Sequence, residues 1–202
     1  IQQGRLDFEP GEEITRVEKS QVNNSCLWRV QYFGYNSVEE DAQGRVVGNY
    51  VGSPFYLEMR TNQQLGYIVW GGATSFKNSS YFYFIIQSGN HPAEYLADQA
   101  EQFTATLTDS LSQLPGEEYL VIKNAVIEKI KENPTSIAEQ AGKFYTMAFD
   151  YDGNFDRNDQ LLDAVDNLTK EKAVEILTRI LNEETMERAT ILLYAKKHEI
   201  GK

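Results

Sequence analysis

Two strand-like runs anchor the fold, and both lie in the segment LGYIVWGGATSFKNSSYFYFIIQS at residues 65–88. The runs are Leu65–Trp70 and Tyr81–Ser88, and both are rich in the β-branched and aromatic residues that favour strands. Gly71-Gly72 and a polar stretch separate them, so the segment predicts a long β-hairpin. The run from Leu27 to Gly34 has the same character and predicts a further strand.

Just before this hairpin, the segment 37–60 carries apolar residues at a helical spacing of four, at Val47, Val51, Phe55 and Met59. Three glycines share that spacing, Gly44, Gly48 and Gly52. Each glycine inside a helix costs up to about 1 kcal/mol relative to alanine, so we expect this stripe to lie where the backbone closely approaches a neighbour. The alternative is that the helix is broken near Pro54.

Beyond the hairpin, helical spacing recurs in residues 93–113, 115–133, 136–148, 159–167 and 170–181, and residues 188–195 resemble a final strand. There is no regular alternation of strand and helix. The sequence therefore predicts an α+β domain, in which helices cover one face of a mostly antiparallel sheet. We interpret residues 1–20 as a connector or an edge strand from a preceding domain, and residues 21–202 as one α+β domain.

Composition excludes several classes of function. The 202 residues hold 19 Lys and Arg against 30 Asp and Glu, and the net charge of −11 repels phosphate backbones, so we expect no nucleic-acid partner. The longest apolar run, Tyr81 to Ile86, is far shorter than the roughly 20 residues of a transmembrane helix, so we expect no membrane span. Because the chain opens at Ile1 and not at Met, we interpret it as a piece of a longer protein.

The usual catalytic motifs are missing from the sequence. The two histidines, His91 and His198, lie far apart and outside any metal-binding spacing, and Cys26 lies in a predicted strand with no histidine near it. A calcium loop starting at Asp152 fails because Arg157 stands where the loop needs glycine. We therefore interpret residues 150–158 as a turn between helices and predict no metal or cofactor site in this chain.

One polar pair remains as a candidate site. Arg60 is predicted to end a helix, and Tyr67 lies early in a strand beside Gly66, which permits a close backbone approach. A guanidinium and a phenol together suit the binding of a carbonyl oxygen or a developing oxyanion. The structural alternative is that Arg60 caps the helix while Tyr67 packs in the core.

The segment around this pair resembles a known signature. Arg60-Thr-Asn-Gln-Gln-Leu-Gly-Tyr67-Ile-Val is similar to the R-T-x-x-Q-L-G-Y-x-V motif in the last domain of the insulysin and pitrilysin family, the inverzincin zinc peptidases. Weaker matches follow in the same order, from about Asn24 to Leu181: Phe84–Ser88, Tyr95-Leu96, Pro134–Glu139, Asn154–Arg157 and Leu168–Glu171. Their order makes the resemblance specific.

The resemblance implies a role within a larger enzyme. In that family, four α+β domains form two halves around a chamber for oligopeptides, and the first domain holds zinc through H-x-x-E-H and a distal Glu. The last domain lends an Arg and a Tyr to the substrate carbonyl and the tetrahedral intermediate, and those roles fall on Arg60 and Tyr67. The implied partners are a zinc-bearing N-terminal half of the same protein and an oligopeptide substrate.

The chain departs from the family in having no H-x-x-E-H, so we expect it to be inactive alone and to depend on zinc bound by another domain. Its acidic charge either lies on the chamber wall, which would favour basic peptides, or on a solvated exterior. The alternative function is that of a non-catalytic peptide-binding or regulatory module with the same fold.

Overall fold

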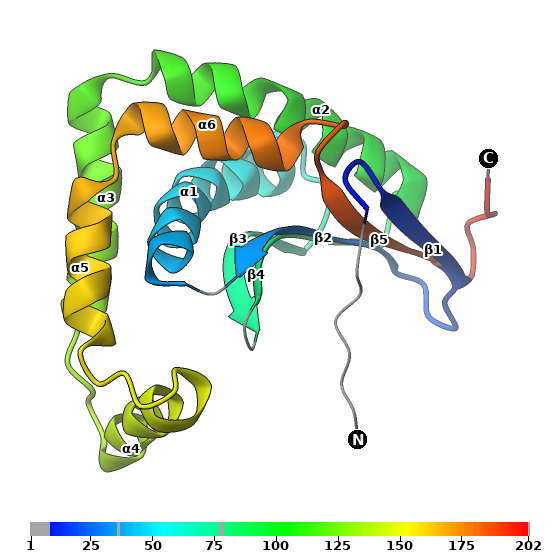
Figure 1. Cartoon of the computed structure of the whole chain (residues 1–202). Helices are drawn as coiled ribbons and strands as arrows, with labels where there is room; N and C mark the ends of the chain where they lie inside the picture. The colour runs from blue at the N-terminus through cyan, green and yellow to red at the C-terminus, as the bar shows by residue number, and fades with distance from the viewer. Residues whose placement is uncertain (1–8, 36, 77–78, 202) are drawn as a thin grey trace.

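A five-stranded sheet lies beside six α-helices and two short π-helical segments in the computed structural model, which describes residues 9–35, 37–76 and 79–201 (Figure 1). The strands are β1 (Glu13–Lys19), β2 (Ser25–Tyr35), β3 (Ile68–Phe76), β4 (Ser79–Ser88) and β5 (Glu187–Tyr194). The helices are α1 (Val38–Tyr56), α2 (Ala93–Gln113), α3 (Gly116–Lys131), α4 (Ile137–Tyr145), α5 (Arg157–Asn167) and α6 (Lys170–Leu181). The π-helical segments are η1 (Leu57–Asn62) and η2 (Thr146–Asp150).

The sheet has the strand order β1-β5-β2-β4-β3, and each pairing is antiparallel except that of β1 with β5. The predicted α+β class and mostly antiparallel sheet are therefore confirmed. β1 is an edge strand of this sheet, and part of the predicted connector, residues 1–8, lies outside the described residues. The domain boundary at residue 20 stays a prediction.

The predicted hairpin forms as β3 and β4, with different bounds from those expected. β3 begins at Ile68 and continues through Gly71 and Gly72, which the sequence suggested as a break between strands. Gly71 faces the core so closely that a Cβ atom there would lie 2.9 Å from the Phe55 ring. The glycine is thus needed for packing, and it does not interrupt the pairing with Phe84.

Helix α1 explains the glycine stripe. Ser37 caps its N-terminus by accepting a hydrogen bond from the backbone N–H of Glu40, and the helix continues past Pro54. A Cβ atom on Gly48 would lie 2.6 Å from the backbone nitrogen of Ala73, so only glycine lets α1 lie directly on β3. The expected close approach is confirmed, and the alternative of a break near Pro54 is wrong.

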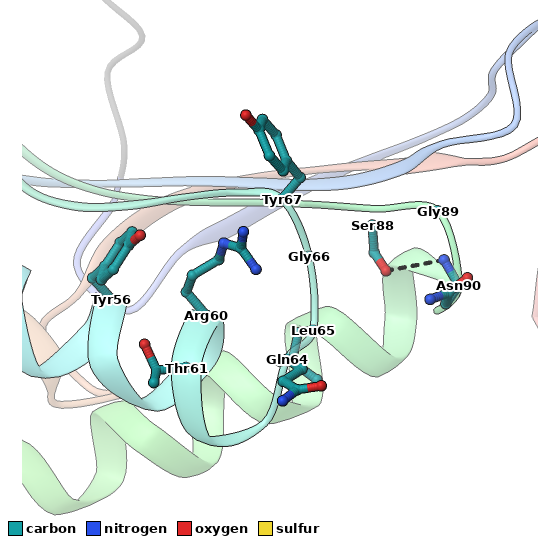
Figure 2. Close-up of a pocket in the computed structure, with 10 residues that line it drawn as sticks. All are labelled: Tyr56, Arg60, Thr61, Gln64, Leu65, Gly66, Tyr67, Ser88, Gly89 and Asn90. Carbon is teal, nitrogen blue, oxygen red and sulfur yellow. Dashed lines mark hydrogen bonds between the residues drawn. The ribbon is translucent and has the colours of Figure 1, made fainter.

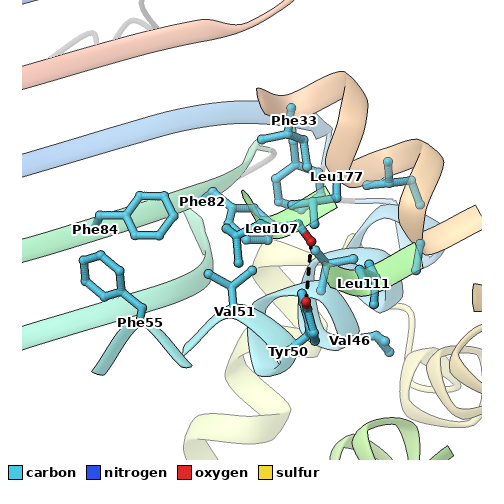
Figure 3. Packing of buried hydrophobic residues seen from close by; sticks show 14 of the residues in the cluster. Phe33, Val46, Tyr50, Val51, Phe55, Phe82, Phe84, Leu107, Leu111 and Leu177 are labelled. Atoms are coloured by element: carbon cyan, nitrogen blue, oxygen red, sulfur yellow. Dashed lines mark hydrogen bonds between the residues drawn. The ribbon is translucent and has the colours of Figure 1, made fainter. Parts of the chain in front are cut away.

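The core lies between the sheet and helices α1, α2 and α6, which cover one face of the sheet (Figures 1 and 3). Alternate residues of β4 are buried, as expected for a strand with one covered face. Phe82 and Phe84 of β4 meet Phe33 and Phe55 at ring distances of 5.7 and 4.9 Å. None of the helices within the described residues is long and apolar enough to span a membrane.

The turn after η2 attaches to α1 through a buried arginine. Asp152 and Gly153 both have positive φ, which suits a tight turn. Arg157 lies over the Tyr151 ring at 3.7 Å and donates a 3.2 Å hydrogen bond to the Asp41 carboxylate of α1. The residue that breaks the calcium pattern therefore holds this turn against the helix.

Candidate functional site

The chain turns from α1 into β3 through η1 and residues 63–67, and this turn carries the candidate site. Two buried side chains, Met59 and Leu65, fix it to the core, and the Leu65 N–H donates to the Met59 carbonyl at 2.9 Å. Glu58 accepts hydrogen bonds from the side chains of Gln63 and Asn62, and these bonds lower its pKa. Packing and hydrogen bonds therefore hold this turn in one conformation, although its polar side chains face solvent.

Gly66 brings the turn against the neighbouring strand. A Cβ atom on Gly66 would lie 2.0 Å from the carbonyl oxygen of Gln87, so no other residue fits without moving the backbone. The next N–H, that of Tyr67, donates to the same oxygen at 3.2 Å. The close approach expected at Gly66 is thus present, and it sets the position of Tyr67 one residue before β3 begins.

Arg60 and Tyr67 lie together at the surface (Figure 2). The guanidinium carbon of Arg60 is 5.3 Å from the centre of the Tyr67 ring, a distance at which a cation and an aromatic ring attract each other. The Tyr67 side chain is 85% exposed, so the alternative in which it packs in the core is wrong. Figure 2 shows the Tyr67 hydroxyl pointing away from the turn.

Both polar groups are available to a ligand. Within residues 9–35, 37–76 and 79–201, neither the Arg60 guanidinium nor the Tyr67 hydroxyl makes a hydrogen bond or an ion pair, so Arg60 is not used to cap the preceding helix. All five N–H donors of Arg60 can therefore reach an acceptor from outside.

A pocket of about 620 Å³ opens at this pair (Figure 2). Its walls come from the end of α1, η1 and the following turn, and from the end of β4 and the segment after it. The lining residues are Tyr56, Arg60, Thr61, Gln64, Leu65, Gly66, Tyr67, Ser88, Gly89 and Asn90. Sequence reasoning missed the Ser88–Asn90 wall, where the Asn90 N–H donates to the Ser88 hydroxyl at 3.2 Å. It also missed Gln64, whose positive φ of 52° was not signalled by a glycine.

A second, larger hollow of about 920 Å³, here called the β3 groove, lies beside this pocket. Tyr56 lines both cavities, so they meet at that side chain. The β3 groove follows α1 and β3, and is lined by residues 69–75 of β3, the glycine stripe of α1, and residues of α3. Its charged lining residues are Asp41, Arg45 and Lys129.

The other candidate groups have structural surroundings. His91 stacks on Tyr95 at 4.9 Å, while the Nδ1 atom of His198 lies 2.9 Å from the Ser25 hydroxyl. Burial raises the pKa of the Cys26 thiol, which disfavours the reactive thiolate. The part of the chain that the structure describes contains no group of three or more His, Cys, Asp or Glu side chains that could hold a metal ion.

Comparison with known proteins shows which proteins share this sequence pattern and fold. Residues 46–145 match the family model "PQQ synthase PqqF-like, C-terminal lobe domain 4". The fold is similar to that of a domain in the crystal structure of pitrilysin, with a TM-score of 0.84, 23% identity, and coverage of 98% of this chain and 21% of that chain. It is also similar to a peptidase M16 inactive domain from Pseudomonas fluorescens, with a TM-score of 0.69, 15% identity, and coverage of 96% and 47%.

Curated relatives agree with these matches. The insulin-degrading enzyme of Drosophila melanogaster is 25% identical over 85% of this chain and 17% of its own length. Protease 3 of Escherichia coli is 29% identical over 70% of this chain and 15% of its own length. The chain thus spans less than a fifth of these relatives. Together the matches support an insulinase/pitrilysin-family C-terminal domain, and the resemblance predicted from the sequence motifs is confirmed.

Proposed function

We propose that this domain closes the peptide chamber of an insulysin-like zinc metalloendopeptidase, and that Arg60 and Tyr67 contact the substrate carbonyl and the tetrahedral intermediate. The main support for the proposal is that the Arg60 guanidinium and the exposed Tyr67 phenol lie together in the lining of one pocket. Neither group makes a hydrogen bond or an ion pair with the described residues. The similarity to multidomain peptidases supports the presence of a second half.

The chemistry follows from the charges that develop during peptide hydrolysis. When a peptide carbonyl becomes tetrahedral, its oxygen gains negative charge, and donors that are already in place stabilise that charge. Arg60 supplies a fixed cation and Tyr67 a phenolic hydroxyl donor. Gly66 and the buried Leu65 hold the pair in position, so little reorganisation is needed when the substrate binds.

The zinc belongs elsewhere in this proposal. The described residues offer no cluster of metal ligands, so they do not fit a zinc ion, and the proposal assigns it to an N-terminal half that also contacts the oligopeptide. This domain contributes binding and oxyanion stabilisation alone. No step of hydrolysis is complete within it.

A second function is favoured by one specific finding. The Pseudomonas fluorescens relative in fold is described as an inactive peptidase domain, so a non-catalytic peptide-binding or regulatory module is the alternative. In that case Arg60 and Tyr67 would hold a peptide that is not cleaved. The alternative predicts that changes at the pair alter peptide affinity with no change in turnover.

Kinetics of Arg60 variants in the full-length protein test the proposal. We expect Arg60→Ala to lower kcat roughly 100- to 1,000-fold, as the loss of an oxyanion donor does, and Arg60→Lys to restore part of it. Arg16→Ala is the matched control, because Arg16 is an exposed arginine on β1 at the opposite edge of the sheet. An equal kcat in wild type and Arg60→Ala, measured at saturating peptide, contradicts the proposal.

A further inference from the structure

The volume of the β3 groove and the strand backbone that lines it suit an extended peptide chain. β3 is the last strand of the sheet and, in the described part of the chain, pairs with β4 alone, so no strand occupies its other edge, although α1 contacts its backbone at Gly71 and Ala73. Edge strands of this kind are common sites for adding a peptide strand. Residues 69–75 of β3 line the groove. The groove has a volume of about 920 Å³ and adjoins the Arg60 pocket at the side chain of Tyr56, which lines both.

The glycine contacts fix the direction of α1 along this groove. Gly52 approaches the Gly71 carbonyl, and Gly48 approaches the backbone of Ala73, so α1 and β3 run in opposite directions. Arg45 precedes Gly48 by one turn, and therefore lies toward Ser75, at the end of the groove remote from Tyr67. Fifteen residues separate Arg45 from Arg60, which corresponds to roughly 20 Å along the helix axis.

The charge at this remote end is opposite to that of the whole domain. The chain carries a net charge of −11, yet the charged residues that line the groove are two cations, Arg45 and Lys129, and one carboxylate, Asp41. The Asp41 side chain is only 6% exposed and contacts the guanidinium groups of both Arg45 and Arg157. Its negative charge is thus offset by two guanidinium groups, which leaves these three residues with one net positive charge.

The two cations can reach a ligand. The Arg45 side chain is 42% exposed, although its Nε atom is 2.7 Å from Asp41. Lys129 is exposed and makes no hydrogen bond or ion pair with any described residue. Its neighbour Lys131, by contrast, lies within 3.9 Å of Glu128 and does not line the groove. The groove lining thus carries one unpaired cation, Lys129, and a second, Arg45, which shares the Asp41 carboxylate with Arg157.

We infer that the β3 groove binds the substrate as an extended peptide, and that Arg45 and Lys129 select an acidic side chain about six residues from the carbonyl held by Arg60. The spacing follows because an extended chain advances about 3.3 Å per residue over roughly 20 Å. This inference rests on the proposed function and adds a sequence preference to it. It predicts acidic peptides as preferred substrates, in spite of the acidic domain.

Competition between matched peptides tests the preference in the full-length protein. Each pair is acetylated and amidated, differs by Glu or Gln at one position four to eight residues from the cleaved bond, and is cleaved in one mixture followed by mass spectrometry. We expect a two- to five-fold preference for Glu near the sixth position, which is the scale of a partly exposed ion pair. The preference should shrink at 0.5 M salt.

Variants show which residues cause the preference for Glu over Gln. We expect Lys129→Gln and Arg45→Gln each to reduce it, and Arg45→Lys to retain most of it. Lys131→Gln is the matched control, because it removes one positive charge from the same helix α3 outside the groove. Thermal unfolding of each variant shows whether loss of the Arg45–Asp41 contact has disturbed the fold.

The outcomes separate this inference from the proposed function. Equal cleavage of Glu and Gln peptides at every position, or a preference that survives both Gln variants, overturns the inference even if Arg60→Ala still lowers kcat. If no peptide is cleaved, fluorescence anisotropy with the same labelled peptides tests the groove by binding. Tighter binding of the Glu peptide that is lost in Lys129→Gln supports the site, while equal binding overturns it.

Discussion

Two parts of the sheet use arginine in opposite ways. Near β1, β5 and β2, the buried residues Arg29 and Arg188 lie 2.6 and 3.1 Å from the Glu101 carboxylate, and Arg188 also lies 2.6 Å from Glu13. Beyond β3, Arg60 is only partly buried and contacts the face of the Tyr67 ring. The same side chain is neutralised inside the protein among strands β1, β5 and β2, here called the paired side of the sheet, and is offered to solvent beyond the β3 edge.

The pKa values of Glu13 and Arg29 reflect their burial and their ion pairs. Burial by itself would raise the pKa of Glu13, but hydrogen bonds from Arg188 and Thr190 outweigh burial, and the pKa is lowered. Burial and the nearby charge of Arg188 lower the pKa of Arg29. The hydrogen bonds on the paired side therefore favour the charged Glu13 carboxylate, whereas the Arg60 guanidinium beyond β3 contacts only the Tyr67 ring among the described residues and suits a ligand.

The largest effect should come from the exposed edge and appear in catalysis. We expect Tyr67→Phe in the intact enzyme to lower kcat by roughly 10- to 1,000-fold, because it removes one donor to the oxyanion. Its free energy of unfolding should change by less than about 0.5 kcal/mol, since the side chain is 85% exposed. Steady-state kinetics and urea unfolding measure both. Unchanged kcat would contradict the assigned role.

On the paired side of the sheet, a substitution should change the free energy of unfolding. Glu101→Ala leaves Arg29 and Arg188, two buried guanidinium groups, without the carboxylate they share, and we expect a loss of about 3 kcal/mol in urea unfolding. Glu128→Ala is the control, because its side chain is 77% exposed and it should cost less than about 0.5 kcal/mol. Equal losses of unfolding free energy in the two variants would show that the Glu101 ion pairs are no more stabilising than an exposed one.

A smaller effect should link structure and catalysis at Gly66. The Cβ atom of Gly66→Ala would collide with the Gln87 carbonyl, so we expect a loss of about 1 to 3 kcal/mol and a lower kcat as Tyr67 moves. Gly142→Ala, in helix α4 with no atom near its Cβ position, should instead stabilise the protein by up to about 1 kcal/mol. If Gly66→Ala behaves like Gly142→Ala, the turn does not hold Tyr67.

The smallest effect concerns pH. Burial and the charges of Lys197, His91 and Lys19 lower the pKa of His198, so the unfolded state binds more protons near the ordinary histidine pKa. The stability contributed by neutral His198 is therefore present above about pH 6.5 and is lost as pH falls below that value. Urea midpoints of wild type should fall slightly more than those of His198→Asn on acidification. Parallel curves would show that His198 contributes nothing.

The sequence predicted those features that local patterns determine. The hairpin followed from residue type, and the close approach of the helix to a neighbour followed from the spacing of Gly44, Gly48 and Gly52. The candidate pair of Arg60 and Tyr67 came from a specific motif. The sequence did not predict that β3 continues through Gly71-Gly72, because tertiary packing against Phe55 decides that. Nor did it reveal the arginine cluster around Glu101, whose members are far apart in the chain.

The candidate site was predictable in its residues but not in its shape. Exposure of Tyr67 depends on the contact of Gly66 with β4, and the Ser88–Asn90 wall comes from a segment twenty residues further on. The β3 groove depends on side chains from α1 and α3, which no local pattern connects. Long-range packing sets these features, so they required the structure.

The most direct test of the central claim mixes this fragment with a zinc-bearing N-terminal half from the same source and measures cleavage of a fluorogenic oligopeptide, with each half alone as control. We predict cleavage in the mixture alone and its loss when the fragment carries Arg60→Ala. No cleavage in the mixture, with both halves folded and the zinc site loaded, would contradict the composite active site and favour the binding module.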